Sequence, residues 1–329
     1  MRILASLFCL ILALVGFAVG GVGYGWLLFT GPGPSPREVQ LVIPRGASTT
    51  SVIRQLGEAG VIADPELVRQ LATHLRQRRA LRAGEYRFPA GVSALAALRQ
   101  VQEGRTVVRR LTVPEGLTVA QVMALIDAAE GLEGPLPIGL REGSLLPETY
   151  HYSWGDTRQE MVSRMQRSMN AAVADAWGRR VTGLPLSDPQ SLVTLASLIE
   201  KETSVEAERT RIAGVFVNRL RRNMRLQSDP TVVFAVTGGR GVLNRPITRA
   251  DLDLRHPYNT YQVSGLPPGA IANPGRASLL AAAQPAVHDE LYFVADGTGG
   301  HAFARTLADH NRNVDRWRQI ERERGLRRD

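Results

Sequence analysis

The stretch Ser191-Leu-Val-Thr-Leu-Ala-Ser-Leu-Ile-Glu-Lys-Glu-Thr203 combines the apolar spacing of a helix with acidic residues at its end. Leu195, Leu198 and Ile199 recur at the three- and four-residue intervals of one helix face. The same spacing, continued by one turn, leads to Glu202. A carboxylate in a core-facing position is desolvated, which disfavours its charged form and raises its pKa. The pattern therefore predicts a helix that holds Glu202 as a proton donor near neutral pH.

Glu200 is the second acid of this stretch, and it follows a neighbouring face with Val193 and Ala196, whose side chains are smaller. The alternative interpretation is a helix whose polar end begins at Glu200, with both carboxylates in solvent. The spacing alone leaves both interpretations open.

The composition describes a globular protein with room for two domains, because 44% of its 329 residues are hydrophobic and 22% are charged. The net charge of +9 comes almost entirely from arginine, since Lys201 is the only lysine. Such a charge suits nucleic acid, anionic lipid or an acidic polymer. No nucleic-acid-binding motif is visible, so we expect no nucleic-acid partner.

The number and spacing of the cysteine and histidine residues argue against bound metals and disulfides. Cys9 is the only cysteine and lies in an apolar segment, which excludes disulfides within the chain and cysteine-based zinc sites. The six histidines lack the paired spacing of metal ligands. We therefore expect neither a metal nor another cofactor.

The N-terminal segment is free of charge over residues 3–29, which exceeds the roughly 20 residues that cross a bilayer. Tyr24 and Trp26 suit a membrane interface. We expect residues 1–29 to be a short cytoplasmic stub and a transmembrane helix, with the bulk of the chain exported. A cleaved signal peptide is the alternative. Residues 30–40, rich in proline and glycine, read as a linker.

Three later segments repeat one pattern, which is a short strand, a Pro-x-Gly turn, a Ser or Thr helix cap and an amphipathic helix. Their first parts are Val42-Ile-Pro-Arg-Gly-Ala-Ser48, Arg87-Phe-Pro-Ala-Gly-Val-Ser93 and Leu111-Thr-Val-Pro-Glu-Gly-Leu-Thr118. The recurrence predicts small mixed α/β modules. Such a module either binds glycan or holds the following domain away from the membrane.

The segment after the opening stretch has apolar residues at positions 212, 215, 216 and 220, which predicts another amphipathic helix. Its exposed side would carry the arginines Arg219, Arg221 and Arg222. Long loops at 257–261 and 265–274 follow between apolar segments. Loops of that length inside a domain are usually functional.

Six short motifs follow one another in the C-terminal half: Leu-Ile-Glu-Lys-Glu-Thr, Asn-Arg-Leu, Arg-Leu-Gln-Ser-Asp-Pro-Thr, Tyr-Asn-Thr-Tyr, Gly-Leu-Pro-Pro-Gly-Ala-Ile and Gly-Gly-His-Ala-Phe. Together they resemble the endolytic murein transglycosylase family. The resemblance implies an α+β protein with an N-terminal transmembrane helix. It also implies a LysM-like α/β module at 41–106, a connecting α/β region at 107–180 and a mixed α+β catalytic domain at 181–329.

The resemblance further implies a single-pass protein of the bacterial inner membrane, with its catalytic region in the periplasm. Its partners would be peptidoglycan glycan strands and the peptidoglycan synthases, the penicillin-binding proteins. The reaction would be a lyase cleavage of the β-1,4 bond between N-acetylmuramic acid and N-acetylglucosamine. It would leave 1,6-anhydro ends and terminate strand elongation. The alternative is a non-catalytic peptidoglycan-binding or scaffold protein of the cell-wall machinery.

The resemblance assigns catalysis to Glu202, the second acid of the Glu-Lys-Glu-Thr motif, with Glu200 as its competitor. Ordinary glycosidases use two carboxylates, whereas here the substrate's own 6-hydroxyl replaces the second one. Glu202 would protonate the leaving oxygen and then deprotonate that hydroxyl. The matching motifs place substrate-binding candidates at Glu200, Gln227, Asp229, Asn259, Tyr261 and His301. Two of these have an alternative role, since Asp229 could instead form a turn and His301 could be a structural histidine.

Overall fold

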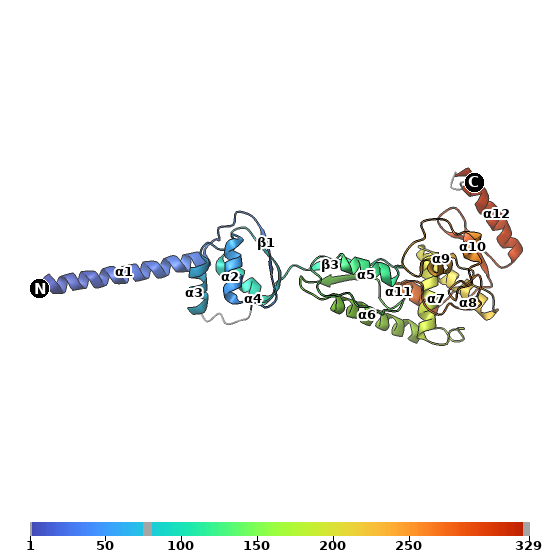
Figure 1. Ribbon diagram of the computed structural model, residues 1–329, viewed down its shortest axis with the longest axis horizontal. Coiled ribbons are helices and arrows are strands. Elements are labelled where there is room, and N and C mark those ends of the chain that lie inside the picture. The colour runs from blue at the N-terminus through green and yellow to red at the C-terminus, as the bar shows by residue number, and fades with distance from the viewer. Residues whose placement is uncertain (1, 75–80, 325–329) are drawn as a thin grey trace. The chain divides into compact units, whose positions relative to one another are not determined.

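The apolar N-terminal segment forms one helix in the computed structural model, which describes residues 2–74 and 81–324. Helix α1 runs Arg2–Thr30, and its part Phe8–Thr30 is long and apolar enough to cross a membrane (Figure 1). This confirms the predicted N-terminal apolar helix, which fits a membrane anchor or a signal sequence. The end of α1 differs from the rest, because Phe29 is fully buried in a core while Phe17 is 84% exposed.

The chain divides into two compact units, each with its own apolar core. The first unit comprises Met1–Arg109, Glu130–Glu133 and His151–Asp156, and the second comprises Arg110–Ala129, Gly134–Tyr150 and Thr157–Asp329.

The first unit builds its core from two strands and three short helices after α1. Strands β1 (Val39–Ile43) and β2 (Gly84–Phe88) pair antiparallel. Helices α2 (Thr49–Glu58), α3 (Pro65–His74) and α4 (Ala94–Glu103) bury apolar faces in the same core as the strands.

The proline- and glycine-rich segment after α1 is not helical, as its composition predicts. It lies against the first unit through backbone hydrogen bonds. Gly33 N donates to Gly91 O at 3.1 Å, and Gly91 N donates to Ser35 O at 2.9 Å. The chain is therefore held to the unit from the end of α1 to the start of β1.

The repeated strand, turn, cap and helix pattern is confirmed in all three copies. Ser48 and Ser93 accept hydrogen bonds at the N-termini of α2 and α4. In the third copy, β3 (Arg109–Thr112) precedes α5 (Val119–Asp127), which Thr118 caps. Strand β3 pairs with β4 (Thr149–Tyr152). These signals are local in sequence, which is why spacing was enough to find them.

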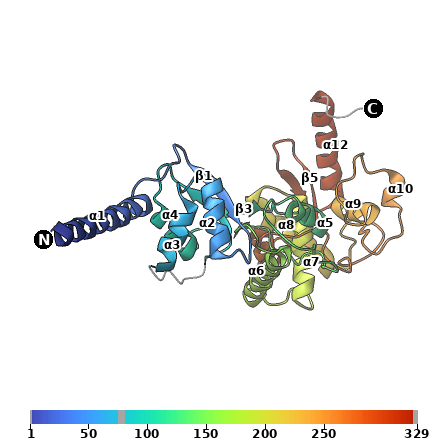
Figure 2. The ribbon, with the colours of Figure 1, turned by 60° about the vertical axis from the view of Figure 1, so that its left-hand side comes forward.

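The second unit is mainly helical, with α6 (Arg158–Gly178), α7 (Pro189–Glu202), α8 (Arg209–Arg221) and α11 (Arg276–Ala283) around one core. The 3-10 turn η1 (Glu206–Glu208) precedes α8, while α9 (Asp229–Thr237) and α10 (Arg249–Leu252) follow it. The antiparallel strands β5 (Tyr292–Ala295) and β6 (His301–Ala304) precede α12 (Leu307–Glu323), which extends away from the rest of this unit (Figure 2). The described residues confirm the α+β fold class.

Helix α7 is the central helix of the second unit. Pro189 begins it, and Asp188 caps it by accepting a hydrogen bond from Ser191 N at 2.7 Å. Every residue from 192 to 199 is buried, so the helix has no solvent face there. Other elements therefore cover the smaller side chains of Val193 and Ala196 as well as the face of Leu195, Leu198 and Ile199. Only its two ends reach solvent, and the C-terminal end carries the two acids.

Candidate active site

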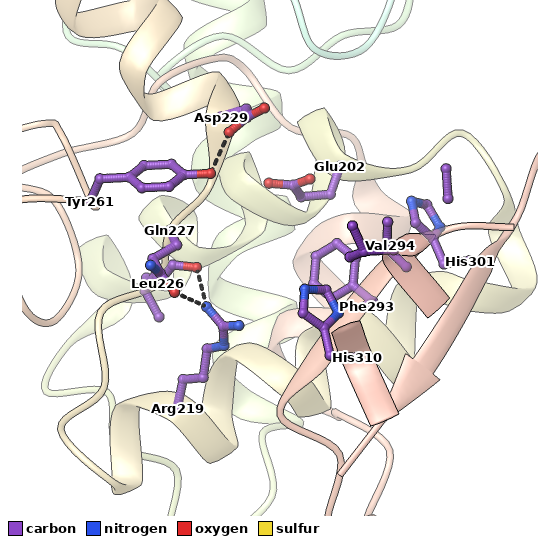
Figure 3. A pocket seen from close by; sticks show the side chains of 12 residues that line it. Glu202, Arg219, Leu226, Gln227, Asp229, Tyr261, Phe293, Val294, His301 and His310 are labelled. Carbon is purple, nitrogen blue, oxygen red and sulfur yellow. Dashed lines mark hydrogen bonds between the residues drawn. The ribbon is translucent and has the colours of Figure 1, made fainter. Parts of the chain in front are cut away.

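Glu202 is the last residue of α7 and lines a cavity of about 470 Å³ (Figure 3). The cavity collects side chains from α8, the loop before α9, the 258–261 loop, the β5–β6 pair and α12. The lining residues are Glu202, Arg219, Leu226, Gln227, Asp229, Tyr261, Phe293, Val294, Ala295, His301, His310 and Val314.

The surroundings of Glu202 make it a group that exchanges a proton near neutral pH. Its side chain is half-buried in a polar but enclosed position, and this desolvation raises the pKa of Glu202 to about 7. The charge of Asp229 also raises the pKa, whereas a hydrogen bond from Ser228 and the charges of His301 and Arg219 lower it. Both protonation states are therefore populated around pH 7.

Ser228 holds the Glu202 carboxyl, since its hydroxyl donates to Glu202 Oε1. Ser228 is only 2% exposed, and its backbone N–H donates to Thr260 Oγ1 at 3.0 Å. Thr260 Oγ1 in turn lies 2.8 Å from Thr231 Oγ1. This buried hydroxyl network fixes the loop opposite Glu202. The sequence interpretation passed over Ser228, although it stands between the two candidates Gln227 and Asp229.

Glu200 points to another part of the unit. Its Oε2 accepts a hydrogen bond from Gly275 N at 2.9 Å, at the start of α11, and its Oε1 lies 3.7 Å from Arg209. The side chain is 6% exposed and does not line the Glu202 cavity. Side chains two positions apart in a helix point in widely different directions, so only one of the two acids reaches the cavity.

Asp229 and Tyr261 form a pair at the cavity wall. The Tyr261 hydroxyl donates to Asp229 Oδ1 at 2.6 Å (Figure 3). Burial raises the pKa of Tyr261, and the adjacent Asp229 raises it further. Gln227 lies beside them in the left-handed region with a φ of 52°. Its Oε1 accepts a hydrogen bond from Arg219 at 3.4 Å.

His301, on β6, reaches the cavity from the opposite side. Its Nδ1 lies 2.7 Å from Glu208 Oε2, and its backbone N–H donates to Glu208 Oε1 at 2.9 Å. The ring also meets the face of Phe293 edge-on. Glu208 therefore fixes the orientation of the imidazole. No sequence signal marked Glu208, since it is 93 residues away from its partner.

Asn259 is fully buried and is not among the residues that line the cavity. Its side-chain amide donates to Leu252 O at 3.0 Å and to Leu254 O at 2.8 Å. Its Oδ1 accepts from Tyr261 N at 3.0 Å. Asn259 therefore shapes the loop that presents Tyr261, so the structure separates it from the other candidates.

Arg219 corrects the expectation for helix α8. It is 7% exposed and lines the cavity, whereas Arg221 and Arg222 are exposed as expected. Its Nε donates to Leu291 O at 2.6 Å, and an η-nitrogen donates to Leu226 O at 2.8 Å. The chain before β5 covers this side of α8, which the periodicity of α8 alone does not reveal. Burial lowers the pKa of Arg219.

A perturbed carboxyl alone does not mark the site, as Glu142 shows. Burial raises the pKa of Glu142 to about 7 as well. Both of its oxygens accept from Val119 N, at 2.9 and 3.1 Å, at the N-terminus of α5. Glu142 is not among the residues that line the Glu202 cavity. What distinguishes Glu202 is the cavity with its other polar groups.

The described residues include no group of three or more His, Cys, Asp and Glu side chains placed to hold a metal ion. Instead, the cavity gathers a half-buried glutamate, a tyrosine–aspartate pair, an oriented imidazole and a buried guanidinium. Such an arrangement suits proton transfer to a polar substrate.

Comparison with known proteins places the chain in a family. The sequence profile of the YceG-like family matches residues 41–316, so the chain belongs to that family. It is 30% identical over 319 residues to the endolytic murein transglycosylase of Bacillus subtilis, covering 86% of each chain. It is 29% identical to the protein of that name from Streptococcus pneumoniae D39, of which it spans 58%. The resemblance seen in the six motifs is thus confirmed.

A solved structure agrees with this assignment. A yceG-like protein from Listeria monocytogenes matches with a TM-score of 0.54 and 29% sequence identity. The match covers 84% of this chain and 99% of the Listeria chain.

Proposed function

We propose that this protein is a membrane-anchored endolytic transglycosylase that cleaves peptidoglycan glycan strands with Glu202 as its only acid and base. The observation that carries the proposal is the half-buried Glu202, with a pKa of about 7, at the wall of a cavity of about 470 Å³. The names of the Bacillus and Streptococcus relatives support the same substrate class.

In the first step, protonated Glu202 donates its proton to the oxygen that joins N-acetylmuramic acid to N-acetylglucosamine. The C–O bond breaks, the N-acetylglucosamine end leaves with a free 4-hydroxyl, and positive charge develops at the muramoyl anomeric carbon. In the second step, the muramoyl 6-hydroxyl attacks that carbon and gives its proton to the Glu202 carboxylate. The product is a 1,6-anhydro ring, no water is consumed, and Glu202 returns to its acid form.

The cavity supports both roles of Glu202. Because its pKa lies near the working pH, Glu202 can both give up its proton and take it back. The Ser228 hydroxyl steadies the carboxylate form that exists between the two steps. One carboxylate therefore suffices, where a hydrolytic glycosidase needs two.

The other cavity groups have roles in the same proposal. Asp229, held by the Tyr261 hydroxyl, places negative charge where the anomeric carbon becomes positive. Gln227 and His301 bind hydroxyl and acetamido groups of the sugars. In contrast, Glu200 and Asn259 act through the backbone that they hold, at Gly275 and at the 252–261 loop.

The other segments of the chain have roles in the same proposal. We propose that α1 anchors the chain in the inner membrane, with the catalytic part (181–329) in the periplasm and a connecting region at 107–180. The buried Phe29 supports an anchor over a cleaved signal, because cleavage would remove a core side chain. Residues 41–106 would be a LysM-like module that binds glycan or holds the enzyme at a distance. Peptidoglycan synthases would be the partners, and cleavage would terminate strand elongation.

Mass spectrometry of the products tests this function. The full chain in detergent should release 1,6-anhydro ends from purified glycan strands, and Glu202→Gln should abolish this release while the protein stays folded. Reducing ends would instead indicate hydrolysis, with Asp229 as the second carboxylate. A folded protein that retains strands without cutting them would fit a binding or scaffold protein. Full activity in Glu202→Gln with loss in Glu200→Gln would move catalysis to the other acid.

A further inference from the structure

A second hollow adjoins the Glu202 cavity and is mostly apolar. This hollow, called here the α9 groove, has a volume of about 350 Å³. Asp229 lines both spaces, so the groove opens at the wall of the catalytic cavity. The lining residues of the groove are Thr118, Gln121, Lys201, Asp229, Pro230, Val233, Phe234, Thr237, Gly241, Val242, Leu243, Arg245 and Ile271.

A third, polar hollow of about 360 Å³ also borders the last turn of α7. Glu202 lines this hollow and the catalytic cavity, while Lys201 lines this hollow and the α9 groove. Each pair of these spaces therefore shares one lining residue, which is Asp229, Glu202 or Lys201. A polymer bound across Glu202 would have room for a side branch at Lys201.

Lys201 is the exposed cation at this junction. Its ammonium donates one hydrogen bond, to Gly116 O at 3.2 Å, which leaves two N–H groups for a ligand. Among the described lining residues of the groove, it is the cation without a carboxylate at ion-pair distance. The other groove cation, Arg245, already binds Asp251 at 2.6 and 2.9 Å.

The choice of lysine at this position is also informative. The chain uses arginine at every other cationic side chain. A compact ammonium can pair with one carboxylate oxygen at a crowded junction, whereas a guanidinium is a wide planar fork. A cation in the last turn of α7 also interacts favourably with the helix dipole, which is its alternative role.

We propose that the α9 groove binds the acidic peptide stem that a muramoyl residue carries beside the scissile bond. This inference rests on the proposed function. The stem of peptidoglycan is short and combines alanyl methyl groups with free carboxylates. The groove side chains of Val233, Phe234 and Leu243 contact the methyl groups, and Lys201 pairs with a carboxylate. Asp229 does not oppose this binding strongly, because its carboxylate faces Tyr261 in the neighbouring cavity.

The groove is less suited to additional sugar rings. Sugars need several exposed hydrogen-bonding groups, whereas most of the exposed lining of the groove is apolar. The apolar lining residues are Pro230, Val233, Phe234, Val242, Leu243 and Ile271. The chemistry of the groove therefore favours a peptide with small apolar side chains over a polysaccharide.

Cleavage of two matched substrates tests the proposal on the full chain in detergent. One substrate is glycan strands that carry their stems, and the other is the same strands after an amidase has removed the stems. We expect faster formation of 1,6-anhydro ends from stem-bearing strands, by roughly tenfold for one charge-assisted contact. Lys201→Met should bring the ratio of the two rates towards one, and Lys201→Arg should retain part of the preference.

Matched controls separate groove binding from general effects of charge. Arg222→Met removes a positive charge from an exposed position outside the groove, so the preference should persist. Val242 is 73% exposed at the groove, so substitutions there should leave the fold intact. Val242→Asp should weaken the preference by repelling the stem, whereas the uncharged Val242→Asn should retain more of it.

A binding measurement detects the contact between Lys201 and the stem without depending on catalysis. Because Lys201 is the only lysine, an amine-selective acylating reagent marks it uniquely among the side chains. A soluble acidic stem peptide should slow acylation of Lys201, and a neutral alanyl peptide of equal length should not.

The outcomes distinguish the two proposals. Equal rates on both substrates, with unchanged acylation, would overturn stem binding and leave the transglycosylase function standing. Failure to form 1,6-anhydro ends from either substrate would overturn the proposed function, and the acylation result would then decide stem binding by itself. A Lys201→Met variant that slows both substrates equally would assign Lys201 to the end of α7 rather than to a ligand.

Discussion

At the scale of single residues, Glu202 combines two opposing influences. Its desolvation and the charge of Asp229 favour the neutral acid, while Ser228, His301 and Arg219 favour the carboxylate. Desolvation and the charge of Asp229 dominate. Glu202 of the folded protein therefore keeps a proton that the unfolded chain releases above about pH 4.5. Proton affinity and stability are therefore linked at this one side chain.

Glu202→Gln should stabilise the protein at alkaline pH. The folded-state pKa of Glu202 is raised, so its favourable contribution is complete below the unfolded value of 4.5 and is lost as pH rises through about 7. Glutamine carries no charge, so it avoids this loss. We expect the variant to gain about 2–3 kcal/mol relative to the wild type between pH 5 and pH 8, from the rise of the pKa from 4.5 to about 7. Urea unfolding at both pH values measures the gain, and an equal difference at the two would contradict the desolvated acid.

Ser228→Ala should move the pH profile of cleavage. The Ser228 hydrogen bond lowers the pKa of Glu202, so its loss should raise that pKa. The first step needs the protonated acid, and the falling limb of kcat/KM should therefore shift to higher pH, by about half a unit to one unit. Ser228→Thr keeps a hydroxyl and serves as the control. An alanine variant with lower activity but an unmoved limb would show that Ser228 acts on something other than the proton of Glu202.

At the scale of elements, α7 depends on contacts with segments far along the chain. Ser197 is fully buried in its centre, where its Oγ accepts from Ile271 N at 3.1 Å and donates to Thr194 O at 2.7 Å. This contact ties the central helix to the 265–271 loop. Glu200 makes the equivalent contact with Gly275 one turn later. Together the two side chains position the end of α7.

Ser197→Ala should therefore destabilise the second unit. The substitution leaves the backbone N–H of Ile271 buried without a partner, which costs about 1–3 kcal/mol. Ser204→Ala, at an exposed position after the end of α7, is the matched control and should change stability by less than about 0.5 kcal/mol. Chemical unfolding of both variants measures the difference. Equal stabilities would mean that water or a shifted backbone satisfies the Ile271 N–H.

The elements also show which features the sequence could predict. The caps at Ser48, Ser93 and Thr118 act within three residues, so the strand and helix units were predicted correctly. The burial of Arg219 was not, because the chain that covers it arrives 72 residues later at Leu291.

The candidate site shows the same limit. The candidates chosen from the motifs include five of the cavity residues, and their roles remain predictions. The motifs could not show that Glu200 binds Gly275 or that Asn259 supports a loop, because these contacts come from tertiary structure. Periodicity also could not show that α7 is covered on every side from 192 to 199.

At the scale of the whole molecule, α1 belongs to two environments. Most of its apolar side chains are exposed, as expected for a helix that faces lipid, while its end contributes to the core of the first unit. The side chains of Leu67 and Leu71 lie next to Gly25 of α1. The apolar helix α1 and the first folded unit are thus joined by a shared core at the end of α1.

Phe29→Ala should test this shared core. Phe29 is fully buried, and removing a buried phenylalanine side chain costs about 3–5 kcal/mol. Phe17→Ala removes the same group from a position that is 84% exposed and should leave the stability of the first unit unchanged. Thermal unfolding in detergent, followed by limited proteolysis within residues 39–103, measures the effect on that unit. Because the second unit has its own core, its unfolding should be the same in both variants. Equal proteolysis of Phe29→Ala and Phe17→Ala would contradict the shared core and would remove the main support for an uncleaved anchor.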